Sequence, residues 1–299
     1  MIIDLVGVDV DPAKIICQTI VPTPGGCGPA TFLNALRFGP PAFQDAFADL
    51  PGESDKEKLA GVIATHGSAP SALVPGQRLF GSRGGVWADD AHKYFKSILG
   101  DRAERLLCTY FELMGQETPA EHLRRIHGLL VLSLERGVPI ITSIRAFAAR
   151  KRQDQEIAWE RIAGHYILIV RVPREVSVGA QGFMFEFVEP AYGKLCEGYI
   201  YSETVRAFKA LKEACAGYMY NETTKEFEPM KGSLQRSEWI ENGFLHVVSP
   251  SLFLETSMQP WYARTFVTLD FGLGKFGSER TPSNDEPDRD APVWNPHLG

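Results

Sequence analysis

Residues 25–36 read GGCGPATFLNAL, a glycine-rich turn that runs directly into an amphipathic pattern. After the turn, apolar residues recur at helical spacing, and the pattern ends near residues 39–41, which read GPP. Pro29 lies where the first turn of a helix tolerates proline. The sequence therefore predicts a short helix with Cys27 at its N-terminus.

This placement suits Cys27 to nucleophilic chemistry. A thiol at a helix N-terminus lies at the positive end of the helix dipole, which favours the thiolate. The flanking glycines allow a substrate backbone to approach closely. A small cysteine buried in a glycine turn would give the same pattern, so this segment alone leaves both interpretations open.

Three further helices are predicted by an acidic residue placed three positions after a capping side chain. These pairs are Ser54 with Glu57, Asp101 with Glu104, and Thr118 with Glu121. The third helix has proline at its first position and stops at Gly137. The chain from about residue 27 to about residue 137 is therefore expected to be mostly helical.

Beyond residue 137 the pattern changes to runs of β-branched and aromatic residues, at 138–144, 165–172 and 183–189. These runs predict an antiparallel sheet, and further strands are expected within 244–271. The polar stretch 149–156 is expected to be an exposed loop. A further helix is expected over 204–216.

Helices followed by strands define an α+β fold class, with an N-terminal helical lobe and a C-terminal antiparallel sheet lobe. We expect one domain over residues 1–276, helical over about 27–137 and sheet over about 138–276. The tail, 277–299, is acidic and rich in proline and is expected to be loose.

Composition narrows the class of protein. The 299 residues are 44% hydrophobic, which is ordinary for a globular chain, and no apolar run approaches the roughly 20 residues of a membrane-spanning helix. A formal net charge of −6 argues against nucleic acid as a partner. Five cysteines without a CxxC pair indicate reduced thiols and a cytoplasmic location, with export by a non-classical route left open.

No cofactor and no metal are expected. Residues 272–277 match the GxGxxG pattern, but a Ser/Pro/Asp-rich tail follows where a dinucleotide-binding fold needs a helix. The histidines include no HExxH motif, and His122 and His127 are five residues apart, on different faces of a helix.

His165 opens the strongly patterned strand 165–172. An imidazole at the end of a strand can face a neighbouring lobe, which is where a general base for a cysteine must lie. Taken alone, without Cys27, His165 would be interpreted as an ordinary, partly exposed histidine.

Four blocks in order resemble papain-like cysteine peptidases: 26–36, 134–141 (LERGVPII), 164–170 (GHYILIV) and 189–190 (EP). They are most similar to the bacteriocin-processing peptidases that act on double-glycine leaders, and to the bacterial relatives of that family. The resemblance covers about residues 18–200.

The resemblance implies Cys27 as nucleophile, His165 as general base and acid, and Glu189 as the group that orients the imidazole. It also implies Gln18 as the oxyanion donor beside the Cys27 amide. Two positions depart from the family. Glu189 stands where the family has Asp or Asn, and Gln18 lies nine residues before Cys27, farther than is usual. Gln18 could instead be an ordinary strand residue.

These residues predict a cysteine hydrolase that cleaves a peptide, isopeptide or related amide bond through a thioester acyl-enzyme, with a peptide or protein as substrate. Acyl transfer to an amine or thiol would use the same residues. A catalytically silent binding or regulatory protein of the same fold is the alternative from a different class.

The strand pattern also predicts a register. If His165 lies opposite Glu189, then Ile167 faces Phe187, Ile169 faces Phe185, and Arg171 faces Phe183. A slip by one residue would turn Glu189 to the other face of the sheet. We predict that Glu189 lies within hydrogen-bond reach of a His165 ring nitrogen and that His165 lies close to the Cys27 sulfur.

Overall fold

A computed structural model describes residues 4–71, 76–81, 85–86, 88–103, 106–114, 116–151, 157–202, 207–209, 218–221, 226–229, 239–241, 245–252 and 265–276. The α-helices in these ranges are α1 (Cys27–Phe38), α2 (Pro41–Asp49), α3 (Asp55–Thr65), α4 (Ala88–Leu99) and α5 (Pro119–Glu135). Short 3₁₀ helices are η1 (Pro12–Lys14), η2 (Gln18–Ile20) and η3 (Gly100–Ala103).

The main sheet is antiparallel and contains eight strands. They are β1 (Leu5–Gly7), β4 (Leu107–Tyr110), β5 (Ile140–Lys151), β6 (Ile157–Pro173), β7 (Gly182–Glu189), β8 (Lys194–Tyr201), β13 (His246–Val248) and β14 (Thr265–Gly274). Small two-stranded pairs join β2 (Phe80–Gly81) with β3 (Gly85–Val86), β9 (Ala207–Lys209) with β12 (Trp239–Glu241), and β10 (Tyr218–Asn221) with β11 (Glu226–Pro229). The predicted α+β class is confirmed.

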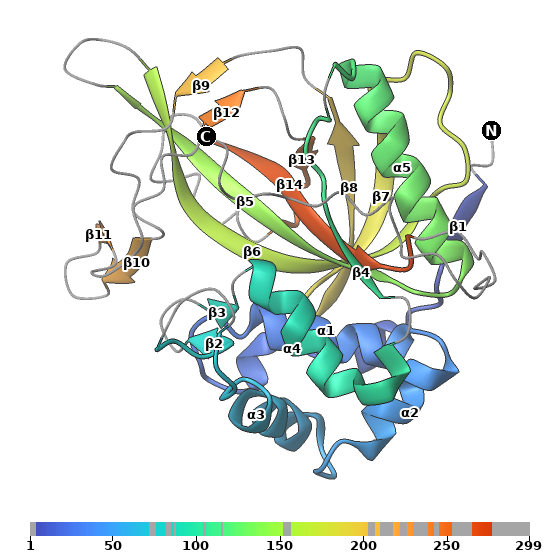
Figure 1. Cartoon of the computed structure of the whole chain (residues 1–299), viewed down its shortest axis with the longest axis vertical. Coiled ribbons are helices and arrows are strands. Elements are labelled where there is room, and N and C mark those ends of the chain that lie inside the picture. The colour runs from blue at the N-terminus through green and yellow to red at the C-terminus, as the bar shows by residue number, and fades with distance from the viewer. Residues whose placement is uncertain are drawn as a thin grey trace, which may run out of the picture.

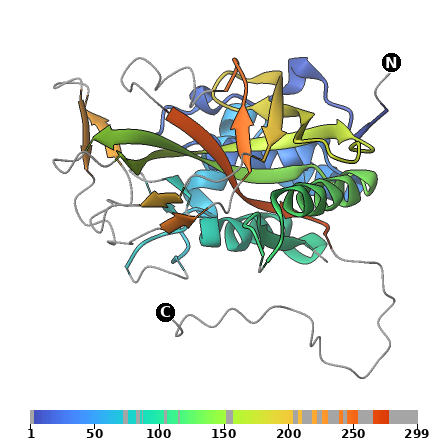
Figure 2. The same ribbon diagram turned by 90° about the horizontal axis from the view of Figure 1, so that it is seen from above.

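Six strands of the main sheet form a closed ring, in the order β6, β5, β14, β13, β8 and β7, because β7 also pairs with β6. Two strands from the first half of the chain add to it: β1 pairs with β6, and β4 pairs with β14. The long β5–β6 pair extends well past its neighbours (Figure 1). Seen from above, β14 crosses the middle of the molecule with α5 beside it (Figure 2).

The buried apolar side chains form two cores. One packs α1, α2, α3 and α4 against residues of the sheet such as Tyr166, Leu168 and Phe271. The other packs α5 against residues of the sheet such as Ile167 and Phe187. Accordingly, α5 lies apart from the other helices in Figure 1. Helix α5, the last helix of the predicted helical region, therefore packs with the sheet, because its buried apolar residues belong to the second core.

The helix α1 is enclosed on nearly all sides, with every residue from Gly28 to Leu36 buried. A helix that is buried all round requires apolar or hydrogen-bonded side chains on every face. Phe32 contacts Tyr94 of α4 and Tyr166 of β6 with ring centroids 5.2 and 6.0 Å apart. These contacts fix the N-terminus of α1 against β6.

Two of the three predicted capping boxes are present, at the N-termini of α3 and α5. The third prediction is wrong: Asp101 lies inside η3, which continues from α4, and Glu104 lies outside the described residues. The local capping pattern at Asp101 does not start a helix because the chain there is still completing the last turn of α4.

Other local predictions differ from the structure. The expected loop at 149–156 is partly strand, because β5 runs to Lys151, which pairs with Ile157. Within the expected helix at 204–216, residues 207–209 form strand β9; the rest, like the tail, lies outside the described residues. Pairing with β12 overrides the helical pattern there. Gly272 and Gly274 of the GxGxxG match lie inside β14, not in a turn before a helix.

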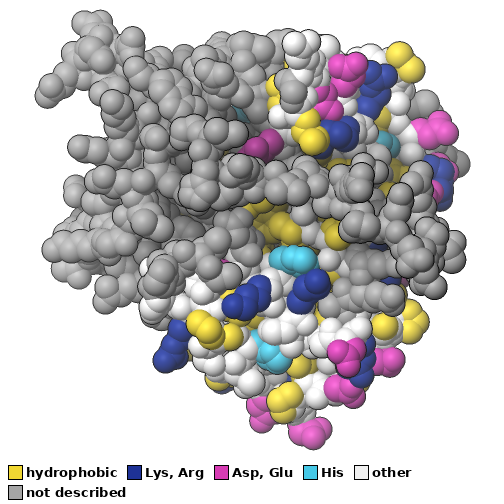
Figure 3. Space-filling model, in the orientation of Figure 1, with side chains coloured by type: hydrophobic (Ala, Val, Ile, Leu, Met, Phe, Trp, Pro, Cys, Tyr) yellow, Lys and Arg dark blue, Asp and Glu magenta, His cyan; other side chains and the backbone are white. Residues whose placement is uncertain are grey.

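Among the described residues, no helix is long and apolar enough to cross a membrane. Both acidic and basic side chains occur over the described part of the face in Figure 3, which fits the modest net charge of −6.

Candidate active site

Cys27 is the first residue of α1 and is half-buried between two buried glycines, Gly26 and Gly28. The Gly26 carbonyl accepts the first helical hydrogen bond from Ala30 N at 3.0 Å. The first N–H groups of a helix have no helical acceptor, and Gly26 has no side chain to cap them. The thiol therefore lies at the positive end of the helix dipole, beside backbone donors.

His165 and Glu189 meet where two strands separate. The β6–β7 ladder ends at the Leu168–Val188 pair, and both residues lie just beyond that end. His165 Nε2 donates to Glu189 Oε1 over 2.5 Å, and both side chains are almost completely buried. The predicted hydrogen bond between these two side chains is confirmed.

The Cys27 sulfur hydrogen-bonds the same imidazole. Because His165 Nε2 is hydrogen-bonded to Glu189, the other ring nitrogen, Nδ1, is the one available to the Cys27 sulfur. Residues from three separate elements, α1, β6 and β7, are thus joined in one chain of hydrogen bonds. The predicted closeness of His165 to the Cys27 sulfur is also confirmed.

The charge state of His165 follows from competing effects. Burial disfavours the imidazolium and by itself would lower the pKa of His165. The Glu189 carboxylate and then the Cys27 sulfur favour the charged ring, by charge and by hydrogen bonding, and together they raise the pKa of His165 from 6.5 to about 10. The ring therefore keeps its proton at neutral pH.

Other histidines behave in the opposite way. Burial lowers the pKa of His66, His92, His122 and His127, so these rings favour the neutral form. His122 Nε2 donates to a backbone carbonyl at 2.9 Å, and His127 Nε2 does so at 2.7 Å. These two are satisfied structural histidines, whereas His165 is paired with a carboxylate and a thiol.

The predicted register of β6 and β7 is wrong by two residues. Ile169 pairs with Phe187 rather than with Phe185, and a bulge then sets Arg171 opposite Glu186 rather than opposite Phe183. A shift by an even number keeps the faces of the sheet unchanged next to the site. This register continues to place Glu189 on the face of His165, but diagonally and not directly across.

The longer side chain of glutamate suits this diagonal geometry. Diagonal neighbours on adjacent strands are about 7–8 Å apart at the backbone, which a long side chain can span. Glu189 Oε1 also accepts a hydrogen bond from Ala191 N at 3.0 Å, within the turn that follows β7. The carboxylate is thus held from its own turn and aimed at the imidazole.

Gln18, the first residue of η2, lies beside the cysteine turn. A Cβ placed on Gly26 would be 3.7 Å from the Gln18 Cβ. The Gln18 backbone N–H donates to the Pro190 carbonyl at 2.8 Å. Among the described residues, its buried Oε1 has no hydrogen-bond partner. Gln18 belongs to a 3₁₀ helix, so the alternative of an ordinary strand residue is wrong.

Strand β3 forms a wall beside Cys27. A Cβ on Gly28 would lie 3.0 Å from Val86 Cγ2, and Tyr166 Oη donates to the Val86 carbonyl at 3.1 Å. Gly85 has φ +67°, and a Cβ there would lie 3.1 Å from the Gly25 carbonyl. A side chain at position 85 would obstruct this close approach, so glycine is required there.

Cys17, Cys108 and Cys196 form no disulfide within the described residues, and Cys215 lies outside them. Within the described part of the chain, no group of three or more His, Cys, Asp or Glu side chains could hold a metal ion.

Comparison of the chain with family models, with curated proteins and with solved structures finds no match. A half-buried thiol, an imidazole that keeps its proton and a buried carboxylate form an arrangement that can supply a nucleophile and a general acid together.

Proposed function

We propose that the protein is a papain-like cysteine hydrolase that cleaves a peptide, isopeptide or related amide bond. The observation that carries the proposal is the His165 imidazole, hydrogen-bonded on one side to Glu189 and on the other to Cys27 at a helix N-terminus. An ordinary buried histidine would pair with a backbone carbonyl and lose its proton, as His122 and His127 do.

In the proposed first step, the Cys27 thiolate attacks the substrate carbonyl carbon, and the carbonyl electrons move to oxygen. The Cys27 N–H and the Gln18 amide stabilise this oxyanion. The intermediate collapses as the C–N bond breaks, and the His165 imidazolium gives its proton to the departing amine. A thioester on Cys27 remains.

In the second step, neutral His165 takes a proton from water, and the oxygen attacks the thioester carbonyl. Collapse of this intermediate releases the acid and returns the Cys27 thiolate beside the protonated ring. Glu189 keeps the imidazole oriented and stabilises its charge throughout, without itself taking up a proton.

Small electrophiles test this proposal without knowledge of the natural substrate. Iodoacetamide, applied at neutral pH with peptide mapping by mass spectrometry, should alkylate Cys27 on the order of tenfold faster than Cys17, Cys108 or Cys196. His165→Ala should abolish the preference. His66→Ala is the matched control, because the His66 ring bonds Ser97 of α4 through Nδ1 and is not part of the proposed site.

Turnover separates the enzyme from a silent homologue of the same fold. The protein should release p-nitrophenol from p-nitrophenyl acetate with transient acetylation of Cys27, and Cys27→Ala should do neither. Adding an amine acceptor distinguishes hydrolysis from acyl transfer by the product formed. Uniform alkylation of the cysteines and no acetyl-enzyme would rule out the proposed function.

A further inference from the structure

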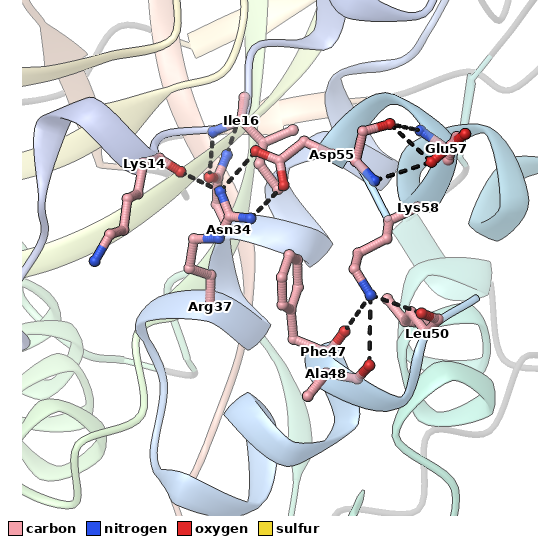
Figure 4. A network of polar contacts seen from close by, with 11 residues as sticks. Lys14, Ile16, Asn34, Arg37, Phe47, Ala48, Leu50, Asp55, Glu57 and Lys58 are labelled. Atoms are coloured by element: carbon pink, nitrogen blue, oxygen red, sulfur yellow. Dashed lines mark hydrogen bonds and ion pairs between the residues drawn. The ribbon is translucent and has the colours of Figure 1, made fainter. Parts of the chain in front are cut away.

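Asn34 is a completely buried polar side chain within α1, seven residues and about two turns after Cys27. Its amide bonds both backbone groups of one residue in the preceding segment. Ile16 N donates to Asn34 Oδ1 at 2.8 Å, and Asn34 Nδ2 donates to the Ile16 carbonyl at 2.9 Å (Figure 4).

This pair of hydrogen bonds is specific to a side-chain amide. A backbone residue presents one donor and one acceptor, and an amide presents the complementary pair. An aspartate would lose the donor, and an apolar residue would leave two buried backbone groups unpaired. Asn34 therefore holds Ile16 against α1 in a way that its apolar neighbours in the helix cannot.

The clamped residue lies two positions before Gln18, and the same segment is held from the other side. Gln18 N donates to the Pro190 carbonyl, in the turn that begins at Glu189. Cys17 packs there too, since a Cβ on Gly193 would lie 2.9 Å from the Cys17 Cβ. Residues 16–18 thus bridge the helix that carries Cys27 and the turn that carries Glu189.

We propose that Asn34 is a positioning residue that, by clamping Ile16 to α1, holds the Gln18 amide where the oxyanion forms beside Cys27. This inference rests on the proposed function. Because Asn34 and Cys27 belong to one rigid helix, a fixed Ile16 sets the distance between Gln18 and the thiol.

Two reagents that both react at Cys27 test the inference. Iodoacetamide alkylates the thiolate by displacement and forms no oxyanion, whereas p-nitrophenyl acetate acylates it through one. Asn34→Asp is expected to keep the alkylation rate within about twofold and to lower the acylation rate by tenfold or more, because loss of an oxyanion donor costs about 10²–10³ in rate. Gln18→Ala should likewise keep the alkylation rate and lower the acylation rate.

The double variant decides whether the two residues act together. If Asn34 acts through Gln18, adding Asn34→Asp to Gln18→Ala should lower acylation little further. Tyr94→Phe is the matched control, because it keeps the ring and removes a buried hydrogen bond to the Val62 carbonyl in the same core, and it should leave both rates unchanged. Asn34→Ser provides a second variant if thermal melting shows that Asn34→Asp does not fold.

The inference would be overturned, while the proposed function stands, if the losses in acylation rate of the two single variants multiply in the double variant. It would also be overturned if Cys27 of the Asn34→Asp protein is acylated at the wild-type rate. Equal loss of alkylation and acylation in both Asn34 variants would also overturn it, since that indicates a collapsed site. A wild-type protein in which neither reagent prefers Cys27 would instead contradict the proposed function itself.

Discussion

The Glu189 carboxylate can orient and charge the imidazole because of the groups that surround it. Its carboxylate is fully buried and accepts hydrogen bonds from His165 and from Ala191 N. A buried carboxylate is tolerated only when it is hydrogen-bonded and charge-paired, and both conditions are met here. In return, its charge is the main factor that raises the pKa of His165.

Glu189→Gln should therefore lower the pKa of His165. Glutamine keeps a carbonyl oxygen for the Ala191 N–H but removes the charge that favours the imidazolium, so burial lowers the pKa from about 10 toward or below 6.5. NMR titration of ¹⁵N-labelled imidazole measures this directly.

Glu186→Gln is the matched control for that titration. It lies on the same strand and pairs with Arg171 at 3.0 Å, away from the site. The Glu186→Gln variant should leave the midpoint of the His165 titration unchanged. Identical midpoints for wild type and Glu189→Gln would show that the carboxylate does not set the charge of the ring.

Helices α1 and α5 pack in different cores. The first is surrounded by one core and carries Cys27 and Asn34. The second packs in the other core and is fixed by His122, which bonds the Phe111 carbonyl, and His127, which bonds the Pro173 carbonyl. Perturbing α5 should therefore affect stability without affecting the thiol.

Thr118→Ala tests this separation. Thr118 and Glu121 form a reciprocal capping box at the start of α5, and loss of an N-cap side chain costs about 1 kcal/mol. Urea unfolding should show this loss, while alkylation of Cys27 by iodoacetamide stays unchanged. Ser177→Ala, an exposed turn position, should change neither quantity. A slower reaction of Cys27 in Thr118→Ala would indicate that the two cores are coupled.

For the whole molecule, shifted histidine pKa values make stability depend on pH around neutrality. The raised pKa of His165 means that the folded protein binds a proton more tightly than the unfolded chain does. Its contribution is complete below pH 6.5 and is lost as the pH rises through about 10. The buried neutral rings of His122 and His127 act in the opposite sense, and their contribution is lost as the pH falls below 6.5.

The free energy of unfolding, measured by urea titration across pH, is therefore expected to decline on both sides of a maximum near pH 6.5. Glu189→Gln should flatten the alkaline decline, because it lowers the pKa of His165 in the folded state. A stability that stays constant between pH 6.5 and pH 10 in wild type would contradict the assignment of a protonated His165.

Short-range features of this chain could be predicted from its sequence. The start of α1 at Cys27, the capping boxes at Ser54 and Thr118, and the strand-forming runs depend on residues within a few positions of one another. The pairing of His165 with Glu189 was also predictable, because the predicted register and any register that differs from it by an even number of residues leave both side chains on one face of the sheet.

Only the tertiary structure decided the remaining features. The register of β6 and β7 differs by two residues from the predicted one, a bulge after Ile169 shifts it by one more, and pairing with a distant strand captures residues 207–209. Ile16 bonds Asn34, eighteen positions away, through backbone groups that any sequence would offer. The amino-acid sequence therefore determined which residues could do chemistry, whereas long-range packing decided the distances between them, since those depend on contacts that no local pattern records.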